Sequence, residues 1–284
     1  MMEQHNFCIV GLGLLGGSYA MGLTRAGCRV TAIDTRAEAI RYAQEHGLIA
    51  AGGTVNFTAL VGQADAVILA LYPGATVDWL RANAAYLKRG ALVTDVCGVK
   101  RAIVDEIQSF LRPDVEFIAS HPMAGREVSG VENADCAMFC AANFIVVPTP
   151  KNTPRGIAFA RALAQTLGFA CITQLTCEEH DCMIGYVSQL THAIAVSLMN
   201  ANDNTHLAQY TGDSFRDLTR IARINAPLWR ELFLLNRDNL LAEIDQFDAA
   251  LSDLRAKLAA GDDAGLEALF RQSSERRARF DKKP

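Results

Sequence analysis

The chain has 284 residues, enough for two domains, and half of them are hydrophobic while a fifth are charged, as in an ordinary globular protein. The formal net charge of −4 gives no indication of binding to nucleic acid or to an anionic membrane. The N-terminal segment MMEQHNF lacks the basic start and apolar stretch of a secretory signal, and we expect no segment that spans a membrane.

The first part of the chain alternates strand-like and helical segments. Apolar, β-branched runs predict seven strands, at residues 7–11, 29–34, 66–71, 91–96, 115–120, 144–149 and 169–175. Continuous apolar strands joined by helical crossovers are typical of a parallel sheet covered on both faces. We therefore predict the α/β class, with a doubly wound, Rossmann-type domain that binds a dinucleotide over residues 1–174.

After about residue 175 the strand signals stop. The run at 179–202 is apolar nearly all round, as in a helix buried among others. Further along, apolar residues recur at spacings of three and four, as in a helical seam: Leu241, Ile244, Phe247, Leu251, Leu254 and Leu258. We predict an all-helical substrate and dimerisation domain over 175–284, and a homodimer, because a partner subunit would cover so apolar a helix.

A glycine turn joins the first predicted strand to a helix. Gly11, Gly13 and Gly16 fit G-x-G-x-x-G, with Leu14 and Leu15 between the last two glycines. In this pattern the glycines permit a tight turn, close approach of a pyrophosphate and close packing of helix on strand. The N–H groups at the helix start then bind the phosphates. We expect these five residues to contact a dinucleotide; a turn that binds nothing would explain only one glycine.

Asp34 ends the second predicted strand, 23 positions after Gly11. A carboxylate there accepts the ribose hydroxyls and repels a 2′-phosphate, so NAD is favoured over NADP. Arg36 weakens this preference, because an arginine can hold that phosphate. Tyr72 and Pro73 form a turn that we expect to lie beside the cofactor.

His121 is the best candidate for acid–base chemistry. It directly follows the predicted strand at 115–120, on the side where parallel sheets bind ligands, and a proline follows it. Histidine accepts a proton near neutral pH, and removal of hydride from a carbinol needs such a base on the hydroxyl.

Three arginines indicate an anionic substrate. Arg216, Arg220 and Arg223 are spaced to share one helix face, and arginine is a natural partner for carboxylates. The alternative is pairing within the helix, of Asp213 with Arg216 and of Asp217 with Arg220.

His192 has a structural interpretation from the residues alone. It lies in the most apolar helix with Ser188 one turn before it, so we interpret it as a core histidine paired with Ser188.

The segment TCEEHDC holds possible metal ligands, but no second cysteine pair accompanies it. We predict no metal and a helix start capped by Thr176. The eight cysteines are scattered, so we expect reduced thiols and a cytoplasmic protein.

The motifs together resemble the prephenate/arogenate (cyclohexadienyl) dehydrogenases of tyrosine biosynthesis over nearly the whole chain. The matching motifs are GLGLLGGS at 11–18, DVCGVK at 95–100, HPMAGREVSG at 121–130, EEHD at 178–181, SQLTHA at 188–193, FRDLTRIA at 215–222 and LWRELFLLNRDN at 228–239. The resemblance implies NAD-dependent oxidative decarboxylation of prephenate to 4-hydroxyphenylpyruvate.

The same resemblance implies roles for individual residues. His121 takes the proton of the ring hydroxyl, and Arg220 binds a substrate carboxylate. His192 lines the pocket near the substrate's side chain, and Glu127 gates it. We expect Arg216 and Ser188 to contribute to the same substrate site.

The sequence departs from the family pattern at two places. Gly98 replaces a serine that helps to hold the hydroxyl, and Gln189 and Thr191 replace a histidine and a proline. Arogenate dehydrogenase, or a cyclohexadienyl dehydrogenase of dual specificity, is an alternative. A β-hydroxyacid dehydrogenase would use a lysine from the helical domain, but none occurs between Lys151 and Lys257. An NAD-binding sensor without turnover is the alternative that is not an enzyme.

Overall fold

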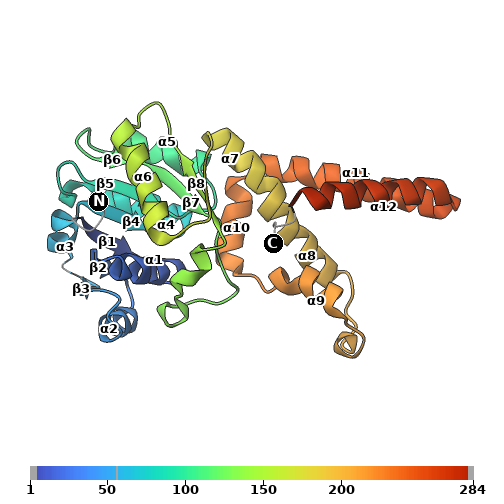
Figure 1. Ribbon diagram of the computed structural model, residues 1–284, viewed down its shortest axis with the longest axis horizontal. Helices are drawn as coiled ribbons and strands as arrows, with labels where there is room; N and C mark the ends of the chain where they lie inside the picture. Colours follow the sequence, from blue (N-terminus) through green and yellow to red (C-terminus); the bar gives the residue numbers. More distant parts are fainter. Residues whose placement is uncertain (1–4, 56, 281–284) are drawn as a thin grey trace. The chain divides into compact units, whose positions relative to one another are not determined.

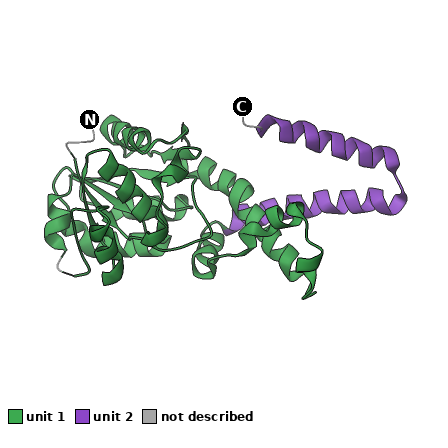
Figure 2. Cartoon of the chain, turned by 60° about the horizontal axis from the view of Figure 1, so that its bottom comes forward, with its two compact units in different colours: residues 1–236 green, residues 237–284 purple. Residues whose placement is uncertain are grey.

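The computed structural model describes residues 5–55 and 57–280 (Figure 1). The chain divides into two compact units, residues 1–236 and 237–284 (Figure 2). The predicted domain boundary after residue 174 remains a prediction.

The main sheet of the first unit has six parallel strands in the order β3-β2-β1-β4-β5-β6. The strands are β1 (Asn6–Val10), β2 (Arg29–Ile33), β3 (Ala51–Gly53), β4 (Ala66–Leu69), β5 (Leu92–Asp95) and β6 (Glu116–Phe117). The helices that follow them are α1 (Leu14–Arg25), α2 (Ala37–Glu45), α3 (Thr58–Gln63), α4 (Pro73–Asn83) and α5 (Arg101–Phe110).

Both faces of this sheet are covered, as the sequence predicts. Alternate side chains of β1 enter two separate cores. Phe7 and Ile9 pack with residues of α1, α2 and α6 (Pro154–Leu167), whereas Cys8 and Val10 pack with residues of α3, α4 and α5. The doubly wound, Rossmann-type fold is therefore confirmed.

A second sheet carries part of the predicted strand at 115–120. Its three strands are β7 (Ala119–Pro122), β8 (Asn143–Val147) and β9 (Cys171–Gln174). We expected only parallel strands, but β7 pairs antiparallel with β8. At this change of sheet β7 stays attached to β5 of the main sheet, because the Ser120 N–H and hydroxyl both donate to Asp95.

The helical part of the first unit begins with one continuous run, Cys177–Asn200. It consists of α7 (Cys177–Ile184), a π-helical segment η5 (Gly185–Leu190) and α8 (Thr191–Asn200). Two helices complete this unit, α9 (Asp213–Thr219) and α10 (Ala226–Leu235). The second unit consists of α11 (Arg237–Ala260), α12 (Asp263–Arg277) and η8 (Ala278–Phe280); the other 3₁₀ turns are η2 (Ala84–Tyr86), η3 (Val131–Asn133), η4 (Cys136–Phe139), η6 (Leu207–Gln209) and η7 (Arg220–Ala222).

The run Cys177–Asn200 is long and apolar enough, by length and composition, to cross a membrane. It is the one such helix within the described residues, and 28% of its apolar window is buried. A core helix of a soluble protein passes the same test, and one such helix is weak evidence for a membrane span.

Candidate active site

The glycine turn forms an open cradle at the start of α1. Gly11 has φ +94°, and a Cβ on it would lie 2.5 Å from the Ala70 carbonyl oxygen. A Cβ on Gly16 would lie 1.8 Å from the Gly11 oxygen, whereas a Cβ on Gly13 would meet nothing within 4 Å. Leu14 begins α1, whose first N–H groups receive no side-chain cap. The turn therefore leaves space and donors for a pyrophosphate at Gly13.

Asp34 lies directly against this turn. Its two carboxylate oxygens accept the backbone N–H of Leu12 at 2.6 Å and of Arg36 at 2.8 Å. The Arg36 guanidinium donates to the Leu12 carbonyl at 3.1 Å and is half exposed. The acid and the arginine are thus placed where an adenosine ribose would be recognised.

The turn at Tyr72 and Pro73 connects the sheet to the helical part of the unit. Tyr72 caps α4 and Pro73 is its first residue. The Tyr72 hydroxyl accepts a hydrogen bond from Asn225 at 2.8 Å, and the Gly74 N–H donates to Glu231 at 2.5 Å. The carboxyl end of β4 therefore faces α10.

A buried ion pair explains the DVCGVK motif. Lys100 and Asp95 are fully buried, with Nζ 2.5 Å from Oδ2. The same ammonium donates to the carbonyls of Cys97 and Ser120 at 2.9 and 2.7 Å. With its three donors satisfied, this lysine fixes the loop after β5 and the start of β7, and so places His121 beside that loop.

Gly98 leaves the space next to His121 without a side chain. A Cβ on Gly98 would lie 3.9 Å from His121 Cε1 and 3.4 Å from Leu232 Cδ2. The neighbouring Cys97 thiol does not serve instead, because it is buried 3.5 Å from the Thr76 hydroxyl. The hydroxyl-holding serine that the family resemblance implies therefore has no counterpart at 97–98.

His121 begins a chain of three side chains. It lies in β7, partly buried, with Nδ1 2.9 Å from His180 Nε2. His180 Nδ1 lies 2.7 Å from Asp181 Oδ1. The Asp181 carboxylate also accepts the backbone N–H groups of Lys100 and Arg101, at 2.8 and 2.9 Å. The EEHD motif thus supports the candidate base.

Burial keeps both imidazoles of this chain neutral at neutral pH. It lowers the pKa of His121 well below the usual value, and the neighbouring His180 and Lys100 lower it further. Burial also lowers the pKa of His180, although the hydrogen bond to Asp181 opposes this shift. A neutral His121 is able to accept a proton.

His192 stacks on an aromatic ring that the sequence analysis overlooked. Its ring lies 3.6 Å from the Trp229 ring, centroid to centroid, at 28°. Its Nδ1 contacts the Ser188 carbonyl at 2.8 Å, so the partner is the backbone of Ser188 and not its hydroxyl. Burial lowers the pKa of His192, the Ser188 carbonyl and Glu127 raise it, and Arg220 lowers it. His192, Glu127 and Arg220 therefore lie close enough for the charges of Glu127 and Arg220 to affect His192.

Of the predicted arginines, Arg220 alone has the arrangement expected of a substrate ligand. It pairs with Glu127, 93 residues away, in a partly exposed ion pair. Arg216 instead pairs with Asp213 at 3.4 Å on the exposed surface, which is the alternative pairing for that residue. A substrate carboxylate can replace Glu127 in this ion pair, as expected of an acid that gates the substrate site.

The three arginines do not share a helix face, contrary to the prediction. α9 ends at Thr219, and Arg220 begins the 3₁₀ turn η7. Asn225 caps the next helix, its side chain accepting the Leu228 N–H at 3.3 Å. Because a new helix starts at Ala226, the preceding one ends before Arg223.

Helix α10 brings the candidate groups to one region. Its Leu232 side chain borders Gly98 beside His121, and Trp229, one turn earlier, stacks on His192. Gln189 is occupied within the fold, because its amide donates to the Leu232 carbonyl and accepts from Asn236. Thr191 donates to the Ser188 carbonyl at 2.6 Å.

The segment TCEEHDC is a helix start. Thr176 and Glu179 form a reciprocal capping box, as the sequence predicts for Thr176. His180 is engaged with His121 and Asp181. Within residues 5–55 and 57–280, no group of three His, Cys, Asp or Glu side chains is placed to hold a metal.

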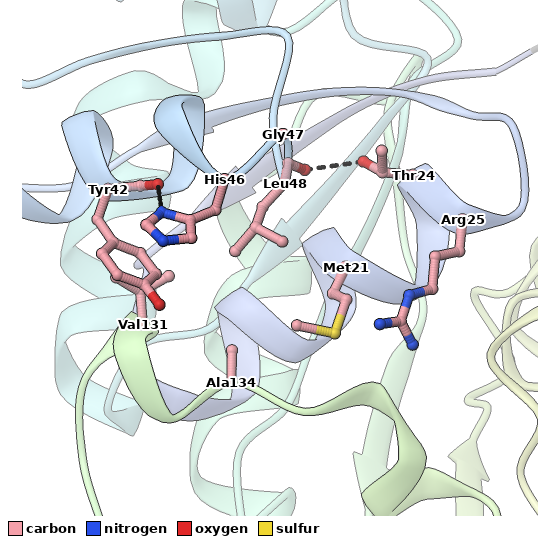
Figure 3. A pocket seen from close by; sticks show the side chains of 9 residues that line it. All are labelled: Met21, Thr24, Arg25, Tyr42, His46, Gly47, Leu48, Val131 and Ala134. Carbon is pink, nitrogen blue, oxygen red and sulfur yellow. Dashed lines mark hydrogen bonds between the residues drawn. The ribbon is translucent and has the colours of Figure 1, made fainter.

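A separate surface pocket lies between α1, α2 and the turn at 131–134 (Figure 3). Its volume is about 340 Å³, and Tyr42 and His46 stack in it at 3.9 Å. None of the predicted site residues lines it. The presence of a pocket alone would therefore favour this surface region as the binding site over the region around His121.

Comparisons with known proteins identify the family of this chain. A family model described as "Prephenate dehydrogenase, nucleotide-binding domain" matches residues 19–172, and "Prephenate dehydrogenase, dimerization domain" matches 176–272. The chain belongs to the prephenate dehydrogenase family.

Relatives in this family extend over most of the chain. The prephenate dehydrogenase of Lactococcus lactis is 32% identical over 93% of this chain and 74% of its own length. The cyclohexadienyl dehydrogenase of Zymomonas mobilis is 29% identical over 96% of this chain and 94% of its own. The crystal structure of prephenate dehydrogenase from Aquifex aeolicus, in complex with hydroxyphenyl propionate and NAD⁺, is 28% identical. It superposes with a TM-score of 0.90 and covers 98% of this chain and 99% of that one.

Proposed function

We propose that this member of the prephenate dehydrogenase family catalyses the NAD-dependent oxidative decarboxylation of prephenate to 4-hydroxyphenylpyruvate. The observation that carries the proposal is the His121 imidazole, held by His180 at 2.9 Å, together with the guanidinium of Arg220, which pairs with Glu127 of the loop after His121. Hydride removal from a carbinol needs the first group, and a dicarboxylate substrate needs the second.

His121 and Arg220 have different roles toward the substrate. Arg220 exchanges Glu127 for a substrate carboxylate, which orients the ring. His121 takes the proton of the C4 hydroxyl as the C4 hydride departs and carbon dioxide leaves C1, and the phenolate oxygen that results takes the proton back. The ring becomes aromatic, so the protein has mainly to position and deprotonate.

NAD accepts the hydride when bound. The open space at Gly13 and the uncapped start of α1 fit its pyrophosphate, with Gly11, Leu14, Leu15 and Gly16 shaping the turn. Asp34 suits the ribose hydroxyls, and Arg36, Tyr72 and Pro73 border the same site.

Substitutions in the glycine turn test this cofactor site. Gly13→Ala should leave the free energy of unfolding within about 1 kcal/mol of the wild-type value, because its Cβ meets nothing, yet raise the Kd for NAD about tenfold. Gly16→Ala should destabilise the fold by about 2 kcal/mol or more, because its Cβ meets the Gly11 backbone. Denaturant unfolding and NAD titration measure both. Unchanged NAD affinity in Gly13→Ala would place the cofactor elsewhere.

Arogenate is a second candidate substrate, favoured by the state of His192. The ring donates Nδ1–H to the Ser188 carbonyl, so the neutral form offers Nε2 as an acceptor. An acceptor suits the ammonium on the side chain of arogenate, whereas the keto acid of prephenate offers no donor there. A cyclohexadienyl dehydrogenase among the relatives supports this alternative.

One steady-state assay separates the candidates. Prephenate and arogenate are each supplied with NAD or NADP, and absorbance at 340 nm reports reduction. We expect turnover of prephenate with NAD, and the ratio of kcat/KM values ranks arogenate against it. No rise in absorbance with either substrate would end the proposal.

We also propose that the active form is a cytoplasmic homodimer. Apolar residues of the helical run are exposed within one chain, among them Met183, Tyr186 and Val187 at 50, 58 and 45%. The matched dimerization domain includes this run. Light scattering at micromolar concentration should give twice the chain mass of 30.8 kDa; a monomer would refute the homodimer.

A further inference from the structure

The hydrogen bonds that link His121, His180 and Asp181 run in one donor-to-acceptor direction, and Asp181 determines which direction it is. Backbone N–H groups only donate, and two of them, from Lys100 and Arg101, point at the Asp181 carboxylate at 2.8 and 2.9 Å. They lie at the start of α5, where a helix favours negative charge. Asp181 is therefore the acceptor at this end of the chain.

Because Asp181 accepts, it determines which ring nitrogen carries the proton, first in His180 and then in His121. His180 must donate Nδ1–H to Asp181, because the two atoms lie 2.7 Å apart. Its neutral ring then has a bare Nε2, which accepts from His121 Nδ1–H at 2.9 Å. The neutral His121 ring is left with its lone pair on Nε2.

We propose that His180 and Asp181 are positioning residues that hold His121 in the tautomer with a bare Nε2, the nitrogen that accepts the substrate proton. The inference rests on the proposed function of His121. His180 is fully buried and Asp181 is 2% exposed, so water does not compete for either hydrogen bond. As the proton arrives at Nε2, the Asp181 carboxylate stabilises the imidazolium through His180.

Asp181→Asn allows the direction of these hydrogen bonds to reverse with little change in shape. Oδ1 faces both His180 Nδ1 and the Lys100 N–H, and Oδ2 faces the Arg101 N–H, so an amide leaves one backbone donor opposite its NH₂ group in either orientation. In the orientation with the amide nitrogen toward His180, that ring must accept at Nδ1 and donate from Nε2. His121 then carries its own proton on Nε2 and cannot act as the base. We expect kcat to fall about a hundredfold while KM for substrate and for NAD change less than about threefold.

Two substitutions of His180 keep the test independent of Asp181. In His180→Gln the amide oxygen replaces the Nε2 acceptor, so we expect kcat within about tenfold of the wild-type value. His180→Leu removes the acceptor and should lower kcat about a hundredfold. Glu178→Gln, an exposed neighbour, is the matched control and should behave as the wild-type enzyme. Thermal unfolding and NAD titration show which variants are folded.

The pH profile of kcat distinguishes positioning from a structural role. The charged groups around the two imidazoles are Lys100, Asp95 and Asp181, while Leu232 of α10 faces the same loop. Loss of the negative charge at Asp181 disfavours the imidazolium form of His121. Its pKa falls further, and the acid limb of the profile moves to lower pH in Asp181→Asn. A loss of folding stability alone predicts no such shift.

A double-mutant cycle completes the experiment. If Asp181 acts through His121, then Asp181→Asn costs no further activity in a His121→Asn background. Equal losses in both backgrounds, or kcat within about threefold of wild type for both Asp181→Asn and His180→Leu, would overturn the inference. A fully active His121→Asn enzyme would instead refute the proposed function itself.

Discussion

His121→Asn should lower kcat about a thousandfold while the Kd for NAD stays unchanged, because one general base contributes about 10²–10⁴-fold. Asparagine keeps a donor where His121 Nδ1 meets His180 at 2.9 Å, so the buried neighbour stays paired. It has no counterpart of Nε2, and so no base for the hydroxyl. Initial rates at saturating substrate and NAD measure the effect.

The control for this variant is His46→Asn. His46 is exposed, stacks on Tyr42 and lines the separate surface pocket, so its loss should leave kcat unchanged. If His121→Asn kept more than about a tenth of the wild-type rate, the role of base would belong to another group. Loss of turnover with retained NAD binding would exclude a sensor that binds NAD without chemistry.

Arg220→Ala should reduce kcat/KM for the substrate about a hundredfold, mainly through KM, because a charge-assisted bond to a carboxylate contributes about 1.5–3 kcal/mol. Arg220→Lys keeps the charge but loses the planar fork, so an intermediate value is expected. Steady-state titration of the substrate at saturating NAD separates KM from kcat.

Arg216→Ala is the matched control. Arg216 pairs with Asp213 on the exposed surface, and such pairs contribute little. We expect kcat/KM within about threefold of wild type. Equal losses for the two variants would mean that a general positive field, and not Arg220 itself, binds the substrate. That result would also restore Arg216 as a substrate ligand.

The main fold was predictable because local patterns determined it. A glycine turn between a strand and a helix, followed by apolar strands with crossovers, fits few architectures. The short strand β3, Ala51–Gly53, escaped prediction because it has no β-branched or long apolar side chain. The antiparallel pairing of β7 with β8 escaped for another reason: it depends on contacts between residues far apart in sequence, such as Ala119 with Val147.

The π-helical segment shows what periodicity does not reveal. His180 and His192 are twelve residues apart, which in an α-helix places them about a third of a turn from a common face. A π turn takes one more residue than an α turn, so the separation becomes close to three α turns. The segment Gly185–Leu190 thus brings both imidazoles to one side of the run.

The candidate site was partly predictable, because some of its residues stand in recognisable motifs. Motifs of unusual residues singled out His121, Arg220 and the glycine turn as candidates. The groups that support them were not recognised, because each acts through a contact distant in sequence. Trp229 meets His192 only after α10 packs, and His180 meets His121 across 59 residues. Arg220 meets Glu127 across 93 residues.

A crystal structure of the protein with NAD and a hydroxyphenyl product analogue tests the central claim most directly. We expect His121 Nε2 within about 2.6–3.2 Å of the analogue's ring hydroxyl, and the Arg220 guanidinium on its carboxylate in place of Glu127. A ring hydroxyl bound by some other side chain, with His121 Nε2 more than about 4 Å from the analogue, would contradict the account.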